Sequence, residues 1–427
     1  MIARALLAVF LALLPVAAIA APTFVAGEAV AVMPMSADAR SQLNPAIAHD
    51  GKSTYLVVWQ QGRFYHQSQS ADVLAIRIDS RGRVLDRQPI VVCNVEASQE
   101  QPQVAFSGGT FLVVWHDLRN GRDWDVYAAR VSPDGKVREP DGFLVAGGTR
   151  NQASPVLAAA DDGFLVVWQH YDRHYQLQAA MIPAAGRARP GQALQFRGKA
   201  LWGGEYALAR VGDGWLLSWN DEKAWSLSGG AATMITRHFA RLAVRNGKPA
   251  VLDVQSSPVV HLGRSGGRFA SDGTSSALYA GWGSAGSGNR IATAALFDAD
   301  PAGPLKNPNP EQARGWSGWN TERMITLYNL DPVDGPVAAA FGQGIYLAVA
   351  RQAYSGKPND RNRLLGSRLT TAGVRIDKAP AWTVLHDSPH RIANPALAGG
   401  SSHFLLAFEQ EDAAGRRQIW AKTLKAE

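Results

Sequence analysis

The feature that most constrains this chain is a short apolar phrase, Leu-Val-Val-Trp followed by a polar residue, which recurs along almost its whole length. Four copies are clear and three are weaker. The last apolar residues of the seven copies are Trp59, Trp115, Trp168, Trp219, Trp282, Ala350 and Phe408. Successive copies are between 51 and 68 residues apart, a loose period that is typical of repeated supersecondary units. The sequence therefore predicts seven copies of one small unit.

Each unit can be divided into four β-strands. A first strand such as Asn44-Pro-Ala-Ile-Ala leads through a glycine-containing turn into the apolar phrase. Because the apolar residues of this second strand are consecutive, both of its faces must be covered. A third strand alternates apolar and polar residues, as in residues 73–78, and a fourth closes the unit. The second strands are predicted near residues 56–60, 112–116, 165–169, 216–220, 279–283, 347–351 and 405–409.

The fold class follows from this division. No segment has a sustained helical period, so the chain is predicted to be all-β. Seven four-stranded antiparallel units with covered inner strands predict a seven-bladed β-propeller. The last unit stops at its third strand, near Leu424, and an unassigned strand stands at residues 28–33. We predict that this N-terminal strand completes the last blade and closes the ring; a six-bladed ring with a degenerate insert is the alternative.

From about Glu28 to the end, the chain resembles secreted bacterial repeat propellers that carry Leu-Val-Val-Trp followed by a polar residue. The resemblance implies the propeller fold and no particular activity, because function depends on the site rather than on the fold. Two segments rich in Gly, Pro, Asn and Arg, residues 256–273 and 301–318, lengthen the period and are expected to be surface insertions.

The N-terminus has the three parts of a secretory signal peptide: Arg4, an apolar run at residues 5–16, and the small residues Ala18 and Ala20. The signal is therefore predicted at residues 1–20 and a single propeller domain at residues 21–427. We expect a periplasmic or extracellular protein without a transmembrane segment. Cys93 is the only cysteine, so no intrachain disulfide can stabilise the fold.

The charges restrict the partners. The formal net charge is +7, but basic residues alternate with acidic ones, which argues against a nucleic-acid partner. We expect neither a cofactor nor a metal site. His170 and His174 have a spacing that suits a metal on a helix, but they are predicted to lie in a loop, where that spacing has no geometric meaning. The oligomeric state is not predictable from the sequence.

A ligand site is expected at one rim of the ring. The turns between first and second strands and between third and fourth strands are short, whereas the remaining loops are longer and rich in charged and aromatic residues. Arginines there either clamp anionic groups or pair with neighbouring aspartates, and tryptophans there either stack on sugar rings or cap the rim. The candidate ligand-binding residues are His116, Asp117, Arg119, Arg122, Trp124, His170, Tyr171, His174, Trp202, Asp221, Trp225, Arg351 and His390.

Two classes of function fit these features. The first is an exported binding module for a carbohydrate or a protein. The second is a polysaccharide-active enzyme with its site in the mouth of the central funnel. A uronide lyase would use Arg119 or Arg122 with a base among His116, His170 and Tyr171. A glycoside hydrolase would pair Asp117 with Asp221 or Glu222.

Overall fold

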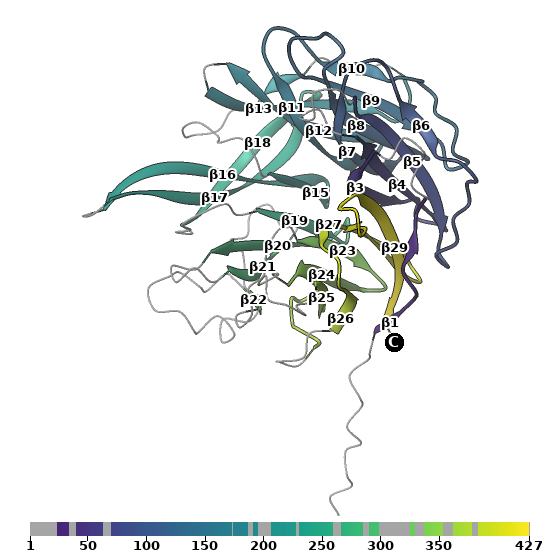
Figure 1. Cartoon of the computed structure of the whole chain (residues 1–427). Coiled ribbons are helices and arrows are strands. Elements are labelled where there is room, and N and C mark those ends of the chain that lie inside the picture. The colour runs from purple at the N-terminus through teal and green to yellow at the C-terminus, as the bar shows by residue number, and fades with distance from the viewer. Residues whose placement is uncertain are drawn as a thin grey trace, which may run out of the picture.

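The structure is a computed structural model, and it shows an all-β ring of seven blades (Figure 1). It describes residues 24–33, 40–62, 70–172, 174–186, 191–194, 206–227, 230–258, 266–284, 290–298, 325–328, 337–352, 362–377 and 383–426. Each blade is an antiparallel sheet whose strands follow one another in chain order. The predicted seven-bladed propeller is confirmed, and the six-bladed alternative is wrong.

The first three blades have regular boundaries. Blade 1 contains β3 (Gln42–His49), β4 (Thr54–Gln61), β5 (Asp72–Asp79) and β6 (Ile90–Cys93). Blade 2 contains β7 (Gln99–Ser107), β8 (Thr110–Asp117), β9 (Asp125–Val131) and β10 (Phe143–Ala146). Blade 3 contains β11 (Gln152–Ala160), β12 (Gly163–Asp172), β13 (His174–Pro183) and β14 (Gln192–Ala193).

The next three blades follow the same order. Blade 4 contains β15 (Ala207–Val211), β16 (Gly214–Leu227), β17 (Gly230–Arg245) and β18 (Lys248–Pro258). Blade 5 contains β19 (Gly266–Ser271), β20 (Ser276–Ser284), β21 (Arg290–Asp298) and β22 (Ile325–Tyr328). Blade 6 contains β23 (Ala338–Gly342), β24 (Ile345–Arg351), β25 (Asn362–Leu369) and β26 (Thr383–Ser388). The expected insertion at residues 256–273 is therefore partly strand, because β18 and β19 extend into it; residues 301–318 lie outside the described part of the chain.

Blade 7 joins the two ends of the chain. It contains β27 (Ile392–Gly399), β28 (Phe404–Glu411) and β29 (Arg417–Ala426), and its outer strand is supplied by β1 (Phe24–Ala26) and β2 (Val30–Ala31). Both N-terminal strands pair antiparallel with β29, and Figure 1 shows β1 beside β29. The predicted closure of the ring is confirmed. The strand predicted at residues 28–33 is shorter, Val30–Ala31, and a second short strand, Phe24–Ala26, precedes it and also pairs with β29.

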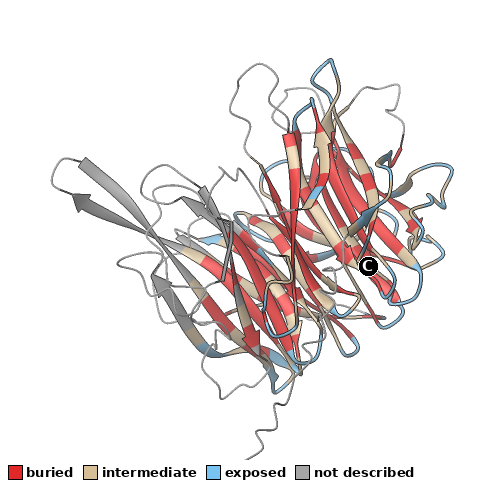
Figure 2. Cartoon of the chain, turned by 90° about the horizontal axis from the view of Figure 1, so that it is seen from below, coloured by how far each residue is buried: buried red, intermediate tan, exposed pale blue. Residues whose placement is uncertain are grey.

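The apolar core is divided among the interfaces between blades. The described buried residues form seven clusters, and each cluster joins two consecutive blades, including blades 7 and 1. In β4, Leu56 and Val58 belong to the cluster shared with blade 2, whereas Val57 and Trp59 belong to the cluster shared with blade 7. Figure 2 shows this continuous burial along the inner strands. Consecutive apolar residues therefore face alternate neighbours, which explains why the repeated phrase does not alternate.

The closing strand offers a direct test of the ring. A variant that lacks residues 24–31 should lose its pairing with β29 and the contact between Phe24 and Phe404, whose ring centroids lie 6.4 Å apart. We expect its melting temperature to fall by about 5 °C or more. Val25 is 49% exposed, so Val25→Ala is the control and should shift the melting temperature by only about 1 °C. An unchanged melting curve for the deletion would show that the closure contributes nothing to stability.

Candidate functional site

A cavity of about 400 Å³ lies between the first strands of five blades. The first strand of each blade is the one that faces the axis of the ring, so this cavity belongs to the central channel. Its polar lining residues are Asn44, Gln101, Gln103, Arg268 and Asn394. Its apolar lining residues are Pro45, Ala46, Ile47, Val104, Phe269, Ala338, Ala339, Pro395, Ala396 and Leu397. The lining therefore combines five polar side chains with aliphatic ones, and most of the surface that it exposes to the cavity is polar.

A bulge shapes the first strand of blades 1, 2, 3 and 7. In each of them the pairing with the second strand shifts register around an X-Pro dipeptide. The residue before the proline has a positive φ, between 44° and 53°. These residues are Asn44, Gln101, Ser154 and Asn394, and we call them the bulge residues. A bulge of this kind redirects a side chain and frees a backbone N–H from the ladder, so it brings polar groups to one level of the channel.

The polar residue that follows the repeated tryptophan accepts the freed N–H of the next blade. The N–H of Gln101 donates to Oε1 of Gln60 at 3.0 Å, and the N–H of Ser154 donates to Nδ1 of His116 at 3.1 Å. Across the closure, the N–H of Asn44 donates to Oε1 of Glu409 at 2.7 Å. The same position in three blades thus forms a hydrogen bond between blades, which explains the polar residue at the end of the repeated phrase.

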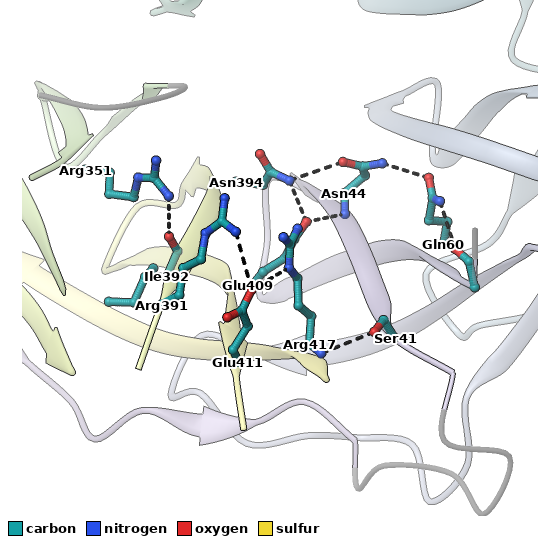
Figure 3. A network of polar contacts seen from close by, with 11 residues as sticks. Ser41, Asn44, Gln60, Arg351, Arg391, Ile392, Asn394, Glu409, Glu411 and Arg417 are labelled. Carbon is teal, nitrogen blue, oxygen red and sulfur yellow. Dashed lines mark hydrogen bonds and ion pairs between the residues drawn. The ribbon is translucent and has the colours of Figure 1, made fainter. Parts of the chain in front are cut away.

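Glu409 is the centre of the polar network at the closure (Figure 3). It is fully buried, and besides the Asn44 N–H it accepts hydrogen bonds from Nδ2 of Asn394 at 2.6 Å and from Nη1 of Arg417 at 2.9 Å. Asn44 donates from its own Nδ2 to Oε1 of Gln60 at 2.7 Å. The amides of Asn44 and Asn394 at the channel are therefore held in fixed orientations by a charge that is itself paired.

Asp117 and Arg119 form an ion pair with one another, which is one of the two alternatives that the sequence leaves open for the arginines. Asp117 is the last residue of β8 and is fully buried, and its Oδ2 accepts from Nε1 of Trp115 at 2.8 Å. The Arg119 side chain makes two hydrogen bonds to the Asp117 carboxylate and one to the Asp141 carbonyl, and its guanidinium lies 3.8 Å from the ring centroid of Tyr127. Gln61 accepts from Trp59 in the same way, at 3.2 Å. In blades 1 and 2, the second residue after the tryptophan therefore satisfies the indole N–H of its own blade.

His116 and Trp124 lie together at the interface between blades 2 and 3. Their ring centroids are 4.4 Å apart, and His116 is 6% exposed. Burial lowers the pKa of His116 to about 4, against a smaller opposing effect of the neighbouring Asp117 carboxylate. His116 is therefore a neutral imidazole whose Nδ1 lone pair is already used by the Ser154 N–H, which does not suit the role of a general base.

Several other predicted loop residues lie in paired strands. His170 and Tyr171 are in β12 and His174 is in β13, so no long loop separates them. Likewise Asp221 and Trp225 are in β16, which pairs with β17 as far as Leu227 and Gly230; this long hairpin is visible in Figure 1. The prediction of loops here was wrong because polar residues after an apolar strand look like a loop, whereas these second strands continue beyond the tryptophan.

The remaining predicted residues are dispersed. Arg351 is buried at the end of β24 and donates from Nη1 to the Ile392 carbonyl at 2.7 Å. Arg122 and His390 are exposed, and Trp202 lies outside the described residues. None of the predicted ligand-binding residues whose side chains the structure describes lines the axial cavity, and sequence reasoning missed all five polar residues that do. The X-Pro dipeptide marks three of them in the sequence, Asn44, Gln101 and Asn394, whereas Arg268 has no such signal.

In the described part of the chain, no group of three or more His, Cys, Asp or Glu side chains could hold a metal ion. Also within the described residues, there is no helix with the length and apolar character needed to cross a membrane.

Comparisons with known proteins support the fold. No protein-family model and no curated protein matches the chain. The polysaccharide lyase Uly1 is similar with a TM-score of 0.50 and 8% identity, over 94% of this chain and 99% of that one. An α-L-arabinanase of Penicillium chrysogenum has a TM-score of 0.48 and 9% identity, over 94% and 98%. An α-L-arabinofuranosidase of Fusarium graminearum has a TM-score of 0.44 and 10% identity, over 94% and 98%. At such identities, the likeness to Uly1 shows a shared fold.

The lowered pKa of His116 predicts acid sensitivity. Because the unfolded chain binds a proton at this residue below about pH 6.5 and the folded chain only below about 4, its contribution to stability is lost as the pH falls through this range. The loss is up to roughly 3 kcal/mol. His116→Gln provides an uncharged acceptor of the kind found at Gln60, so it should preserve the melting temperature at pH 7.5 and reduce its fall between pH 6.5 and 4. Equal acid sensitivity of variant and wild type would contradict the assignment.

Proposed function

We propose that this protein is an exported binding module that holds a carbohydrate in the axial cavity, which the ligand enters from the loop-rich rim. The observation that carries the proposal is the composition of the cavity, which is lined by the amide side chains of Asn44, Gln101, Gln103 and Asn394 together with aliphatic residues. Export rests on the signal peptide predicted at residues 1–20.

The amides suit the hydroxyl groups of a sugar. Each amide offers both a donor and an acceptor, and a hydroxyl group likewise donates and accepts. Aliphatic side chains such as Ile47 and Leu397 can pack against the C–H faces of the same ring. The cavity volume of about 400 Å³ lies within the usual range of small-ligand sites, about 300–1,000 Å³. A short saccharide therefore fits both the polarity and the size.

The alternative, a polysaccharide-active enzyme, has less support from the geometry. None of the described residues that line the cavity is Asp, Glu, His or Tyr, so a pair of carboxylates or a general base is not seen at its wall. Asp117 and Arg119 are used by one another. Uly1 is a polysaccharide lyase, which makes acidic and neutral polysaccharides the first ligands to screen and an assay for unsaturated products the necessary companion experiment.

Gln103 provides the test of the site. Its side chain is half-buried and has no hydrogen-bond partner among the described residues, so Gln103→Leu should not remove an internal contact. We expect this variant to bind the preferred glycan about 3- to 10-fold more weakly than the wild type, since one hydrogen bond contributes about 0.5–1.5 kcal/mol. Glycan arrays identify the ligand, and calorimetry measures the affinities.

The matched control is Gln178→Leu. Gln178 is also a half-buried glutamine, but it lies on the third strand β13, away from the axis, and the equivalent residue opposite Trp59 is Leu74. Its affinity should equal that of the wild type. Equal weakening by both substitutions, or release of unsaturated or reducing sugars by the wild type, would contradict a binding site of this kind.

A further inference from the structure

The register of the blades defines a ring of equivalent positions around the channel. In every blade, one residue of the first strand pairs with the residue two before the end of the repeated phrase. These seven residues are Ile47, Val104, Leu157, Leu208, Arg268, Ala339 and Leu397, and we call them the channel ring. Six of the seven are aliphatic, and the seventh is an arginine in blade 5.

Arg268 differs from the arginines of the third strands. Arg77, Arg130 and Arg368 lie 2.6 Å from a carboxylate of Asp86, Glu139 and Asp377 respectively. The side chain of Arg268 is exposed, and its Nη1 donates a hydrogen bond to the carbonyl of the preceding Gly267 at 3.0 Å. It makes no ion pair with any described residue, and it lines the cavity. Its positive charge therefore lies at the channel without a counter-ion among the described residues.

Gln103 is a second polar residue among aliphatic equivalents. It lies on the first strand of blade 2, one residue closer to the loop-rich rim than the channel ring. The equivalent residues of that level are Ala46, Gln103, Val156, Ala207, Gly267, Ala338 and Ala396. Gln103 is the one polar residue among them. Blade 2, which carries Gln103, and blade 5, which carries Arg268, lie three places apart in the ring of seven, so the two side chains enter the same cavity from opposite sides.

We propose that the carbohydrate held in the axial cavity is acidic, and that Arg268 binds its anionic group while Gln103 contacts a hydroxyl group across the channel. This inference rests on the proposed function, because it names the class of ligand for the same cavity. A guanidinium group forms bidentate hydrogen bonds with planar anions. The anion can be the carboxylate of a uronic acid or a sulfate ester, and the experiment distinguishes the two.

The experiment compares three oligosaccharides of similar length by calorimetry: an oligogalacturonate, its methyl-esterified form and a sulfated galactose oligomer. We expect the wild type to bind one of the two anionic oligosaccharides at least about tenfold more tightly than the methyl ester, because a hydrogen bond to a charged group contributes about 1.5–3 kcal/mol. This preference should weaken as salt is added. Whichever anion binds more tightly identifies the group.

Arg268→Leu is the decisive variant, because leucine is the residue at the equivalent positions 208 and 397 and should fit the channel ring. It should abolish the preference for the anionic oligosaccharide and leave the affinity for the methyl ester unchanged. Arg87→Leu is the control, since Arg87 is an exposed arginine between β5 and β6, and it should retain the preference.

The possible failures can be told apart. Equal binding of the charged and esterified forms, with no effect of Arg268→Leu, would overturn the acidic ligand and leave the carbohydrate site standing. Binding of no oligosaccharide here and no glycan on the arrays would overturn the proposed function and this inference with it. A preference for anions that Arg268→Leu retains would place the anionic group elsewhere and also overturn the assignment.

Discussion

The hydrogen bond between the end of one apolar strand and the bulge of the next blade is the constraint on which this ring depends. Apolar side chains fill each interface between blades, but apolar packing is non-directional and tolerates small shifts of one sheet against another. The bulge N–H has one direction, and it meets Gln60, His116 or Glu409 across three interfaces. Each such bond therefore sets the height of one blade relative to its neighbour.

That alignment explains why the residue after the apolar phrase accepts a hydrogen bond in blades 1, 2 and 7, although its chemical type differs among them. The acceptor is an amide in blade 1, an imidazole in blade 2 and a carboxylate in blade 7, because only one lone pair is required. The carboxylate at the closure brings a further requirement, since a buried charge must be paired. Arg417 and Asn394 meet it, so a network of polar side chains forms at the interface between the two ends of the chain.

Much of the fold could be predicted from the sequence. The seven apolar phrases all lie in second strands, and the closure differs from its prediction by a few residues. These predictions succeeded because they depend on the spacing of the repeated phrase and on its consecutive apolar residues, which can be recognised in the sequence of each repeat. Asp117, His170 and Asp221 were wrongly assigned to loops. A polar residue after an apolar strand is typical of a loop, but here the strand continues. The indole of Trp115 is the partner of Asp117, and Gln152 on the first strand of the same blade is the partner of His170.

The cavity residues could not be found by the same reasoning, because a channel is assembled from strands that are far apart in the sequence. Gln103 and Arg268 differ from the equivalent residues of the other blades, and this difference is visible only when the first strands are aligned by their pairing. At the position of Arg268, the other six blades have an aliphatic residue. The exposed guanidinium group of Arg268 makes no ion pair with any described residue, so no contact in the described part of the chain explains an arginine where the other blades have an aliphatic residue. Residues that break a local rule without a structural gain are those at which function is expected. The channel ring therefore indicates the site more directly than the charged residues of the loop-rich rim do.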